Sequence, residues 1–474
     1  MVGKIVRLQA ALLVLPLIVS LIYGEKCVFA FLITIGISLV VGFGLTLISR
    51  PKNRVIYAKE GFAIVALAWL AMSAIGALPF VISGEIPHYV DAFFETVSGF
   101  TTTGASILRE VEPLSHGMFF WRSFTHWIGG MGVLVIIMAV MQSSDRTIHI
   151  LRAEVPGPTF GKLVPKIKDT AKILYLIYIV LTAIEVIFLL CGGMPLFDSL
   201  VHSFGTAGTG GFGIKSASIG YYSHYCQWVI TIFMLLFGMN FNLFYLLLIR
   251  RFKSVLKSGE MWCYFAIVLV SIGLITLNID PIYQSFSESI RLSSFQVSSI
   301  ITTTGYATAD FADWPTLSKS ILLVLMFIGG CAGSTAGGIK VSRVVLLFKE
   351  IKRQLQNMLH PRSVGAVKLD DKRVGEHTLR SVNNYLAVYV FCFFAIFLLL
   401  CFEPFDIETN FSAATACFNN VGPGLALVGP TSNYADYSIF SKLLLSLAML
   451  LGRLEIYPIL LTLAPSMWLE RKHK

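Results

Sequence analysis

The chain has 474 residues, of which 55% are hydrophobic and only 14% are charged, and its formal net charge is +10. This composition excludes an ordinary soluble domain. The positive charge does not indicate a nucleic-acid-binding face, because the basic residues are spread between alternate apolar segments.

Ten apolar segments are predicted to be membrane spans or parts of spans. A hydrocarbon core about 30 Å thick requires about 20 mostly apolar residues. In chain order the segments are 8–23, 27–49, 61–82, 117–142, 172–192, 224–249, 261–279, 318–328 continuing to about 357, 383–402 and 437–465. No Ala-x-Ala-like cleavage site follows the first segment, so we expect a retained helix rather than a signal peptide.

Lys and Arg gather in every second connection between these segments, and this asymmetry predicts the orientation. The basic clusters lie at 4–7, 50–59, 146–172, 250–257, 340–373 and 471–474. The intervening connections are poorer in Lys and Arg and carry acidic residues. The positive-inside rule therefore predicts a multi-pass protein with both termini in the cytoplasm.

The outer connections contain a fourfold internal repeat. Each has a short apolar stretch, at 87–97, 195–204, 288–300 and 406–418, followed by a glycine-bearing loop. The loop glycines Gly104, Gly211, Gly305 and Gly422 are separated by 107, 94 and 117 residues. The stretches are too short to cross a bilayer, so we expect half-helices that enter from outside. Four such loops can present a ring of backbone carbonyls to a cation; the alternative is that the glycines only permit tight turns.

This repeat predicts an all-α polytopic membrane protein with four membrane helix–pore helix–membrane helix units around one central pore. Two extra transmembrane helices precede the first unit. The predicted divisions are 1–55 for the N-terminal helices, and 56–150, 151–258, 259–375 and 376–474 for the four units.

The inner segment of the third unit, 316–357, is too long for a single straight span. At 1.5 Å per residue it would measure about 63 Å, twice the hydrocarbon thickness. Its middle, 329–338, holds five glycines in ten positions, which disfavour helix by about 1 kcal/mol each. We expect an unwound loop here; the alternative is a small-xxx-small packing stripe along an intact helix.

Arg453 lies in the apolar inner span of the fourth unit. A charged side chain near the middle of a membrane must face a polar cavity or a partner. Two interpretations stay open at this point. Arg453 either places a positive charge in the pore that blocks resting occupancy or is an anchor bound to carbonyls of the filter helices.

The loops, the interrupted helix and the run Gly452-Arg453-Leu454-Glu455 resemble the Trk/Ktr/HKT superfamily of potassium transporters, and its bacterial Trk branch in particular. The resemblance implies one pore per subunit, a homodimer, and a separate TrkA-like cytoplasmic ring that binds nucleotide. It places potassium ligands at Thr102, Thr103, Gly104, Thr209, Gly210, Gly211, Thr303, Thr304, Gly305, Asn420, Val421 and Gly422. It places the gate at Gly329, Gly330, Gly333, Ser334, Thr335, Gly337, Gly338 and Lys340, together with Arg453. The basic connections 146–172 and 340–373 are the candidate docking surface for the ring.

Two departures from the family pattern concern the shape of the filter. Ala105 stands where loops two and three have an aromatic residue after the glycine, and the fourth loop reads Asn-Asn-Val-Gly-Pro. Because all four glycines are kept, the resemblance implies potassium as the substrate, with rubidium able to follow and sodium carried weakly.

The expected function is therefore potassium uptake across the bacterial inner membrane, not enzyme catalysis. The alternatives are a cation-coupled secondary transporter, including a Na⁺/K⁺ symporter of the Ktr type, and an intramembrane enzyme. An enzyme would need paired catalytic groups; His126 and His202 are the best candidates, and no nucleophile elbow accompanies either. A transporter of organic solutes would need inverted repeats, whereas these four units share one orientation.

Overall fold

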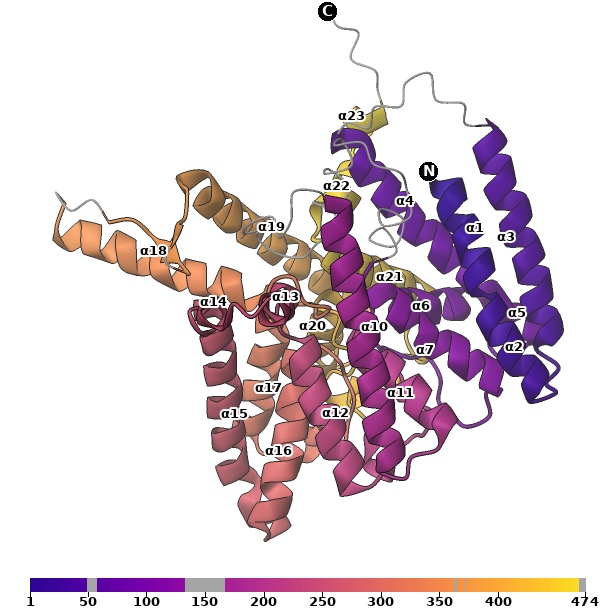
Figure 1. Cartoon of the computed structure of the whole chain (residues 1–474), viewed down its shortest axis with the longest axis horizontal. Helices are drawn as coiled ribbons and strands as arrows, with labels where there is room; N and C mark the ends of the chain where they lie inside the picture. The colour runs from indigo at the N-terminus through magenta and orange to yellow at the C-terminus, as the bar shows by residue number, and fades with distance from the viewer. Residues whose placement is uncertain (49–57, 133–166, 362–364, 371, 469–474) are drawn as a thin grey trace, which may run out of the picture.

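The structure is a computed structural model that describes residues 1–48, 58–132, 167–361, 365–370 and 372–468. Regular structure within these residues is almost entirely helical, which confirms the predicted all-α class (Figure 1). The exception is a small antiparallel hairpin of β1 (Lys368–Leu369) and β2 (Lys372–Arg373).

Three helices precede the first repeat and make up two candidate spans, where the sequence predicted two helices. They are α1 (Val2–Leu12), α2 (Val14–Ile22) and α3 (Val28–Ile48). Val2–Ile22 and Val28–Ile48 are each long and apolar enough to cross a membrane. A Cβ at Gly3 would lie 2.6 Å from the carbonyl oxygen of Gly42. Glycine therefore lets α1 and α3 cross at close range, a common way for membrane helices to pack.

The four units that follow share one order of elements. The first consists of α4 (Ala58–Gly76) with α5 (Leu78–Ser83), then α6 (Tyr89–Phe100) and α7 (His116–Gly130). The second is α10 (Ile167–Cys191), α11 (Leu196–Gly208) and α12 (His224–Phe237). The third is α15 (Gly259–Tyr283), α16 (Phe286–Ile301) and α17 (Thr316–Ile328), and the fourth is α19 (Glu376–Leu400), α20 (Ile407–Phe418) and α21 (Ile439–Arg453). The short helices α6, α11, α16 and α20 lie where the four half-helices were predicted, and their entry from outside stays a prediction.

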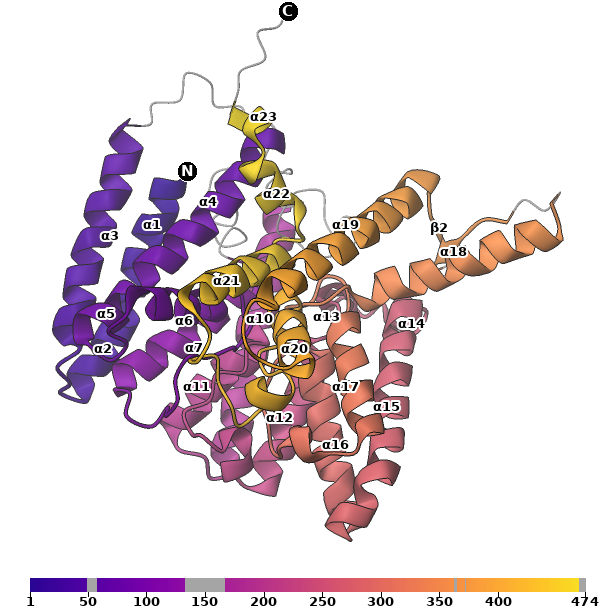
Figure 2. The ribbon, with the colours of Figure 1, turned by 180° about the vertical axis from the view of Figure 1, so that it is seen from behind.

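The remaining elements connect or extend these units. They are η2 (Ser218–Tyr221), η3 (Phe311–Asp313), η4 (Ala426–Val428), α13 (Phe241–Leu248), α14 (Phe252–Leu256), α18 (Val341–Leu359), α22 (Tyr457–Leu463) and α23 (Pro465–Trp468). Helices α18 and α19 extend together from the body of the molecule (Figure 2).

Two predicted spans are not straight helices. The segment 224–249 bends by 91° between α12 and α13, because the side chain of Asn240 caps the new helix by accepting from the N–H of Asn242. The segment 437–465 breaks after Arg453, where Glu455 and Ile456 take left-handed φ values of +54° and +66°. Positive φ in a β-branched residue is unusual, and only the surrounding structure can impose it.

Two other predictions reach beyond the described residues. Helix α7 ends at Gly130, and positions 133–142 of the predicted span 117–142 lie outside the described part of the chain. Two predicted boundaries between units, 55/56 and 150/151, also lie outside it. The division of the chain at those residues stays a prediction.

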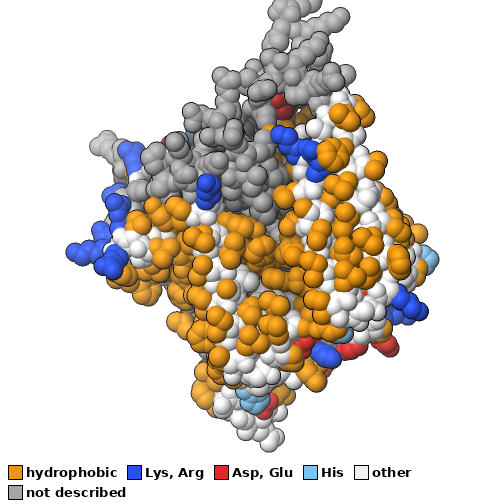
Figure 3. Space-filling model, turned by 45° about the vertical axis from the view of Figure 1, so that its right-hand side comes forward, with side chains coloured by type: hydrophobic (Ala, Val, Ile, Leu, Met, Phe, Trp, Pro, Cys, Tyr) orange, Lys and Arg blue, Asp and Glu red, His pale blue; other side chains and the backbone are white. Residues whose placement is uncertain are grey.

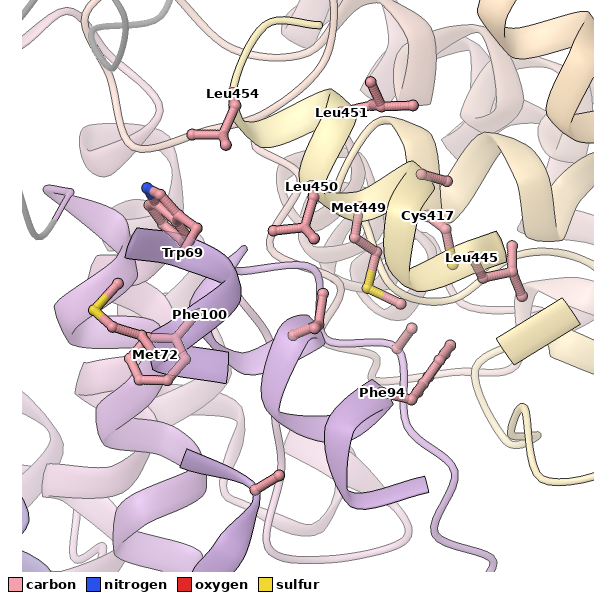
Figure 4. Close-up of a cluster of buried hydrophobic side chains, with 14 of the residues drawn as sticks. Trp69, Met72, Phe94, Phe100, Cys417, Leu445, Met449, Leu450, Leu451 and Leu454 are labelled. Carbon is pink, nitrogen blue, oxygen red and sulfur yellow. The ribbon is translucent and has the colours of Figure 1, made fainter. Parts of the chain in front are cut away.

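The first and fourth repeats pack against each other, so the chain closes on itself. Trp69 and Met72 of α4 and Phe100 of α6 face Leu450 and Met449 of α21 across one buried cluster (Figure 4). All of these side chains are at most 2% exposed. This core brings the two ends of the repeat array together.

The outer flank of the molecule is apolar. Figure 3 shows hydrophobic side chains covering the visible face, with Lys and Arg gathered near its margins. The exposed apolar side chains of the described residues include Phe29 and Ile48 of α3 and Leu269 and Leu277 of α15, which are between 67% and 85% exposed. Together with six helices in the described residues that are long and apolar enough to span a bilayer, this surface indicates a multi-pass membrane protein.

Candidate functional site

All four short helices end in the same backbone motif. The residue after the left-handed turn, Thr103, Gly210, Thr304 or Val421, donates its N–H to the carbonyl five residues earlier, at 2.8–2.9 Å. The residue in the turn itself, Thr102, Thr209, Thr303 or Asn420, has φ between +54° and +57°. This is the Schellman ending, which satisfies carbonyls at a helix C-terminus. Glycine is usual at its left-handed position, so Thr and Asn there are a distinctive choice.

The glycine that follows each ending touches the next loop. The φ values of Gly104, Gly211, Gly305 and Gly422 are +80°, +76°, +85° and +102°. A Cβ on Gly104 would lie 2.0 Å from the carbonyl oxygen of Gly210, and a Cβ on Gly211 would lie 2.0 Å from the carbonyl oxygen of Thr304. A Cβ on Gly305 would lie 2.2 Å from the carbonyl oxygen of Val421, and a Cβ on Gly422 would lie 2.6 Å from the carbonyl oxygen of Thr103. Loop one thus meets loop two, two meets three, three meets four, and four returns to one. The four loops form a closed ring that only glycine fits.

The polar side chains inside the ring are bonded to one another. Thr101 and Thr103 share a hydrogen bond of 2.8 Å between their hydroxyls, and Thr302 and Thr304 share an equivalent bond of 2.7 Å. Asn420 donates to Oγ1 of Thr103 at 2.9 Å. Four helix C-termini, each with a partial negative charge, therefore end at one ring of oxygen-bearing loops. Such an arrangement favours a cation at its centre.

The structure thus brings together all twelve residues that the resemblance assigned to the filter. Each lies in one of the four touching loops, at or beside its left-handed turn. Their role as potassium ligands stays a prediction.

A buried ion pair supports loops one and two. Glu95 of α6 accepts from Nε of Arg122 of α7 at 2.6 Å, and the two side chains are 0% and 4% exposed. The second oxygen of Glu95 accepts the N–H of Ile107 at 3.0 Å, and Arg122 also donates to the carbonyl of Gly213 at 2.9 Å. One charged pair therefore joins the short helix α6, the helix α7 that follows it, and the segments after the glycines of loops one and two.

His126 and His202, the candidates for a catalytic base, have structural contacts instead. Nδ1 of His126 lies 2.8 Å from the carbonyl of Gly99 and so carries the proton, while Nε2 accepts the N–H of Phe212 at 3.3 Å. The ring nitrogens of His202 lie 3.4 Å and 3.2 Å from the hydroxyls of Tyr306 and Tyr222. Each histidine therefore contacts an element of the loop ring.

The aromatic residues after the loop glycines explain two of the contacts between repeats. Phe212 of loop two lies under the guanidinium of Arg122, 3.6 Å from ring centroid to Cζ. Tyr306 of loop three donates its hydroxyl to the carbonyl of His202 at 3.1 Å. Each aromatic side chain therefore packs into the preceding repeat and fastens its loop there.

The inner segment of the third repeat is unwound over residues 329–340, as predicted from its length; we call this segment the interrupting loop. Helix α17 ends at Ile328 and α18 begins at Val341. The N–H groups of Ile339 and Lys340 donate back to the carbonyls of Phe327 and Ile328, at 3.0 Å and 2.9 Å. These bonds close the base of a loop, so the small-xxx-small interpretation along an intact helix is wrong.

The tip of the interrupting loop contacts loops three and four. The N–H of Gly337 donates to Oγ1 of Thr303 at 2.6 Å, and that of Gly338 donates to the carbonyl of Asn419 at 3.2 Å. A Cβ on Gly337 would lie 2.3 Å from the same Asn419 oxygen. The loop therefore presses backbone to backbone against the ring.

Other contacts brace the interrupting loop from the side. Buried Glu260 accepts the N–H of Ala332 at 2.6 Å, and Cys331 donates its N–H to the carbonyl of Gly238 at 2.9 Å. Lys340, also buried, donates its ammonium group to the carbonyl of Ala336. The interrupting loop therefore packs against the break between α12 and α13 and against the start of α15; we call this contact surface its seat.

Arg453 joins the interrupting loop to the first repeat. It donates to the carbonyl of Thr335 at 2.7 Å and to those of Gly129 and Gly130 at 2.5 Å and 2.8 Å. Its partners are the interrupting loop and the end of α7, whereas the anchoring interpretation expected pore-helix carbonyls. Arg453 is buried, with 7% of its surface exposed. Its positive charge is stabilised by the three carbonyl oxygens that it contacts.

A second ion pair lies where the interrupting loop enters α18. Arg343 contacts both carboxylate oxygens of Glu455, at 3.1 Å and 2.5 Å, and its guanidinium lies 4.0 Å from the ring centroid of Tyr385. This bidentate geometry is the favoured one for an Arg–carboxylate pair. It holds the left-handed break after α21 against the start of α18.

On the outer side, the connections are tied in the same cyclic order as the loops. Glu112 accepts the N–H and the hydroxyl of Ser216 at 2.7 Å and 2.6 Å, and these bonds lower the pKa of the Glu112 carboxyl. Ile219 donates its N–H to the carbonyl of Ala307 at 3.1 Å. Thr431 donates to Asp310 at 2.6 Å, and Tyr434 donates its N–H to the carbonyl of Ser106 at 2.8 Å. The ring is thus fastened from outside as well.

Sequence reasoning missed the residues that support the site. Arg122, Glu260, Arg343 and Glu95 were not singled out as supports, although each is at most 6% exposed. The available signal was a charged residue within or beside an apolar segment, since such residues must find partners. Their partners could not be named, because they lie far along the chain: Glu95 and Arg122 are 27 residues apart, and Arg343 and Glu455 are 112 residues apart.

Comparisons with known proteins agree with this architecture. A family model described as "TrkH: Cation transport protein" matches residues 28–472. The chain is 37% identical over 477 residues to the Trk system potassium uptake protein TrkH of Salmonella typhimurium and to that of Escherichia coli K12, a match that spans 99% of this chain and 98% of each relative. It also matches the crystal structure of the potassium transporter TrkH from Vibrio parahaemolyticus with a TM-score of 0.88 and 32% identity, over 99% of this chain and 98% of that chain. The resemblance drawn from the loops is confirmed.

Substitution of Gly305 tests whether the ring needs glycine. In Gly305→Ala the new methyl would meet the carbonyl oxygen of Val421, so we expect a large drop in the thermal unfolding temperature in detergent, or no folded protein. Gly84→Ala is the matched control, because Gly84 has a similar φ of +79° with nothing within 4 Å of the added Cβ. The control isolates the cost of the left-handed backbone, about 1–2 kcal/mol. Equal losses in the two variants would contradict the ring.

Removal of Arg122 tests the support of loops one and two. Arg122→Ala leaves the Glu95 carboxylate buried without its partner, so we expect a loss of about 3–5 kcal/mol in stability. Arg109→Ala breaks the exposed pair with Asp436, whose side chains are 71% and 67% exposed, and should cost at most about 1 kcal/mol. Thermal unfolding of both variants measures the difference. Similar small losses would show that the buried pair does not hold the loops.

Proposed function

This chain belongs to the TrkH family of cation transport proteins, and from that premise we propose that it takes up potassium through a single gated pathway in each subunit. The single observation that carries the proposal is the closed ring of four glycine loops. The curated relatives are named potassium uptake proteins, and the fold supports the same substrate here.

The ring acts as the selectivity filter in this proposal. A potassium ion entering from outside exchanges its water shell for carbonyl and hydroxyl oxygens of the four loops. The four pore-helix C-termini add a favourable negative potential. Gly104, Gly211, Gly305 and Gly422 serve by having no side chain, because any Cβ would displace a neighbouring loop.

The interrupting loop is the gate. It is seated against loops three and four through Gly337 and Gly338, so an ion that leaves the filter meets the loop backbone. Opening requires the loop to leave this seat, and the hydrogen bonds of Arg453 and Glu260 oppose that movement. The resting state is therefore closed, and an input from elsewhere must open it.

Arg453 is both an anchor and a charge in this account. Its bond to Thr335 holds the interrupting loop closed, and its bonds to Gly129 and Gly130 fix the guanidinium to the first repeat. A cation 4 Å from such a charge would be opposed by about 4 kcal/mol at an effective dielectric near 20. The two sequence-based interpretations are thus combined in one side chain.

The distribution of charged residues and the family membership together support a proposal for the membrane, the orientation and the partners of this protein. We place the protein in the bacterial inner membrane with both termini in the cytoplasm, because the basic connections alternate with acidic ones. The subunit pairs as a homodimer and is controlled by a TrkA-like cytoplasmic ring that senses nucleotide. Helix α18 is a candidate contact for that ring, since it begins where the interrupting loop ends and carries exposed Lys349 and Lys352; residues 146–166 of the other candidate region lie outside the described part.

Rubidium flux tests the proposed function. Purified protein in liposomes should take up rubidium down its gradient when a nucleotide-binding ring is added, with a smaller basal uptake without the ring, and sodium should compete weakly. Empty liposomes and liposomes with the Gly305→Ala protein, if it folds, serve as controls. Absence of rubidium flux under both conditions would overturn the proposal, and uptake strictly dependent on a sodium or proton gradient would favour the cation-coupled transporter instead.

Substitution of Arg453 tests the gate. Arg453→Ala removes the bond to Thr335 and the charge together, so we expect basal rubidium flux per folded molecule to rise several-fold. Arg453→Lys keeps the charge but loses the planar donor fork that reaches three carbonyls. Its rubidium flux should therefore lie between those of the wild type and Arg453→Ala. If both variants fold and conduct as the wild type does, Arg453 does not hold the gate.

A further inference from the structure

The first glycine loop lacks the aromatic side chain that fastens loops two and three. Phe212 and Tyr306 follow their glycines and pack into the preceding repeat, whereas loop one has Ala105 at this position. In the cyclic order of the ring, the repeat that precedes loop one is the fourth. The boundary between repeats four and one therefore needs another support.

Tyr434, from the outer connection of the fourth repeat, occupies this boundary. Its backbone N–H donates to the carbonyl of Ser106 at 2.8 Å, two residues beyond the glycine of loop one. Its ring packs beside Phe94 of the first pore helix, with 5.7 Å between centroids. Its hydroxyl donates to the carbonyl of Gly422 at 2.8 Å, and the residue is 2% exposed. Tyr434 thus touches loop one through its backbone N–H and loop four through its hydroxyl.

The bond to Gly422 makes the fourth loop different from the others. Among contacts with the described residues, the carbonyls of Gly104, Gly211 and Gly305 accept no hydrogen bond, whereas that of Gly422 accepts the tyrosine hydroxyl. Three of the four glycine carbonyls are therefore free to turn toward an ion. The fourth is held by a donor that lies outside the ring and reduces the electron density it can offer to an ion.

We propose that Tyr434 is a specificity-determining residue of the filter, which replaces the missing aromatic of loop one and fixes the carbonyl of Gly422. This inference rests on the proposed function, because it assigns Tyr434 to the filter of that pathway. A fixed carbonyl cannot follow a smaller ion inward. The tyrosine hydroxyl therefore disfavours sodium, whose stronger pull on carbonyls would otherwise close the ring around it.

The hydroxyl can be removed without removing the ring. Tyr434→Phe keeps the packing on Phe94 and frees the Gly422 carbonyl. Tyr437→Phe is the matched control: Tyr437 is 4% exposed, and its hydroxyl donates to Asn410 at 3.1 Å, away from the loop ring. We expect the preference for potassium over sodium to fall about two- to tenfold in Tyr434→Phe, the factor that corresponds to one neutral hydrogen bond, and to stay unchanged in Tyr437→Phe.

Two measurements separate the possible outcomes. Rubidium uptake with sodium competition reads selectivity in flux, normalised to folded protein, and thermal stabilisation of detergent-purified protein by potassium and by sodium reads ion preference without flux. A lowered preference in Tyr434→Phe alone supports the inference in either measurement. An unchanged preference, or an equal loss in both variants, overturns it. Absence of rubidium flux in the wild type would overturn the proposed function, while the stabilisation ratio would still decide the role of Tyr434.

Discussion

Contact between each loop glycine and a carbonyl of the next loop is the interaction on which the rest of this structure depends. It is made four times and returns to its start, with the space for each missing Cβ filled by a backbone oxygen. Irregular backbone at membrane depth is tolerated only where it is buried in protein or lines a polar path. Here each loop is buried by its neighbours, so no loop could keep its conformation alone. The Schellman endings, the Glu95–Arg122 pair and the outer ties all serve to hold the loops in this mutual contact.

Because the four repeats belong to one chain, they can differ where function needs a difference. The third repeat has an interrupting loop in place of a continuous inner helix, and the fourth supplies Arg453 to hold that loop. Loops two and three are fastened by their own aromatic residues, while the boundary between four and one uses Tyr434. A ring of identical subunits would have to repeat each of these features four times, and four interrupting loops could not share one seat. A near-fourfold ring of loops is thus combined with an interrupting loop on one side.

The sequence predicted those features that depend on residue type alone. Glycine spacing predicted the loops, because no other residue fits where backbones meet, and length predicted the interruption at 329–340. The 91° bend before α13 was not predicted, since Asn240 reads as an ordinary polar residue within an apolar run. The break at Glu455 and Ile456 was missed because their left-handed backbone is imposed by neighbours, among them Arg343. The role of Tyr434 was also missed, because it depends on contacts with two residues that are far apart in the chain: Ser106 in the first repeat and Gly422 in the fourth.

The most direct test of the central claim is to locate a bound ion. The structure of the protein determined in rubidium, with anomalous scattering recorded at the rubidium edge, should show a peak on the common axis of the four loops. The peak is expected to be enclosed by residues 102–104, 209–211, 303–305 and 420–422, and to persist when an equal concentration of sodium is added beside the rubidium. A rubidium peak outside this ring, or its loss in equal sodium, would contradict the claim that these loops form the potassium-selective site.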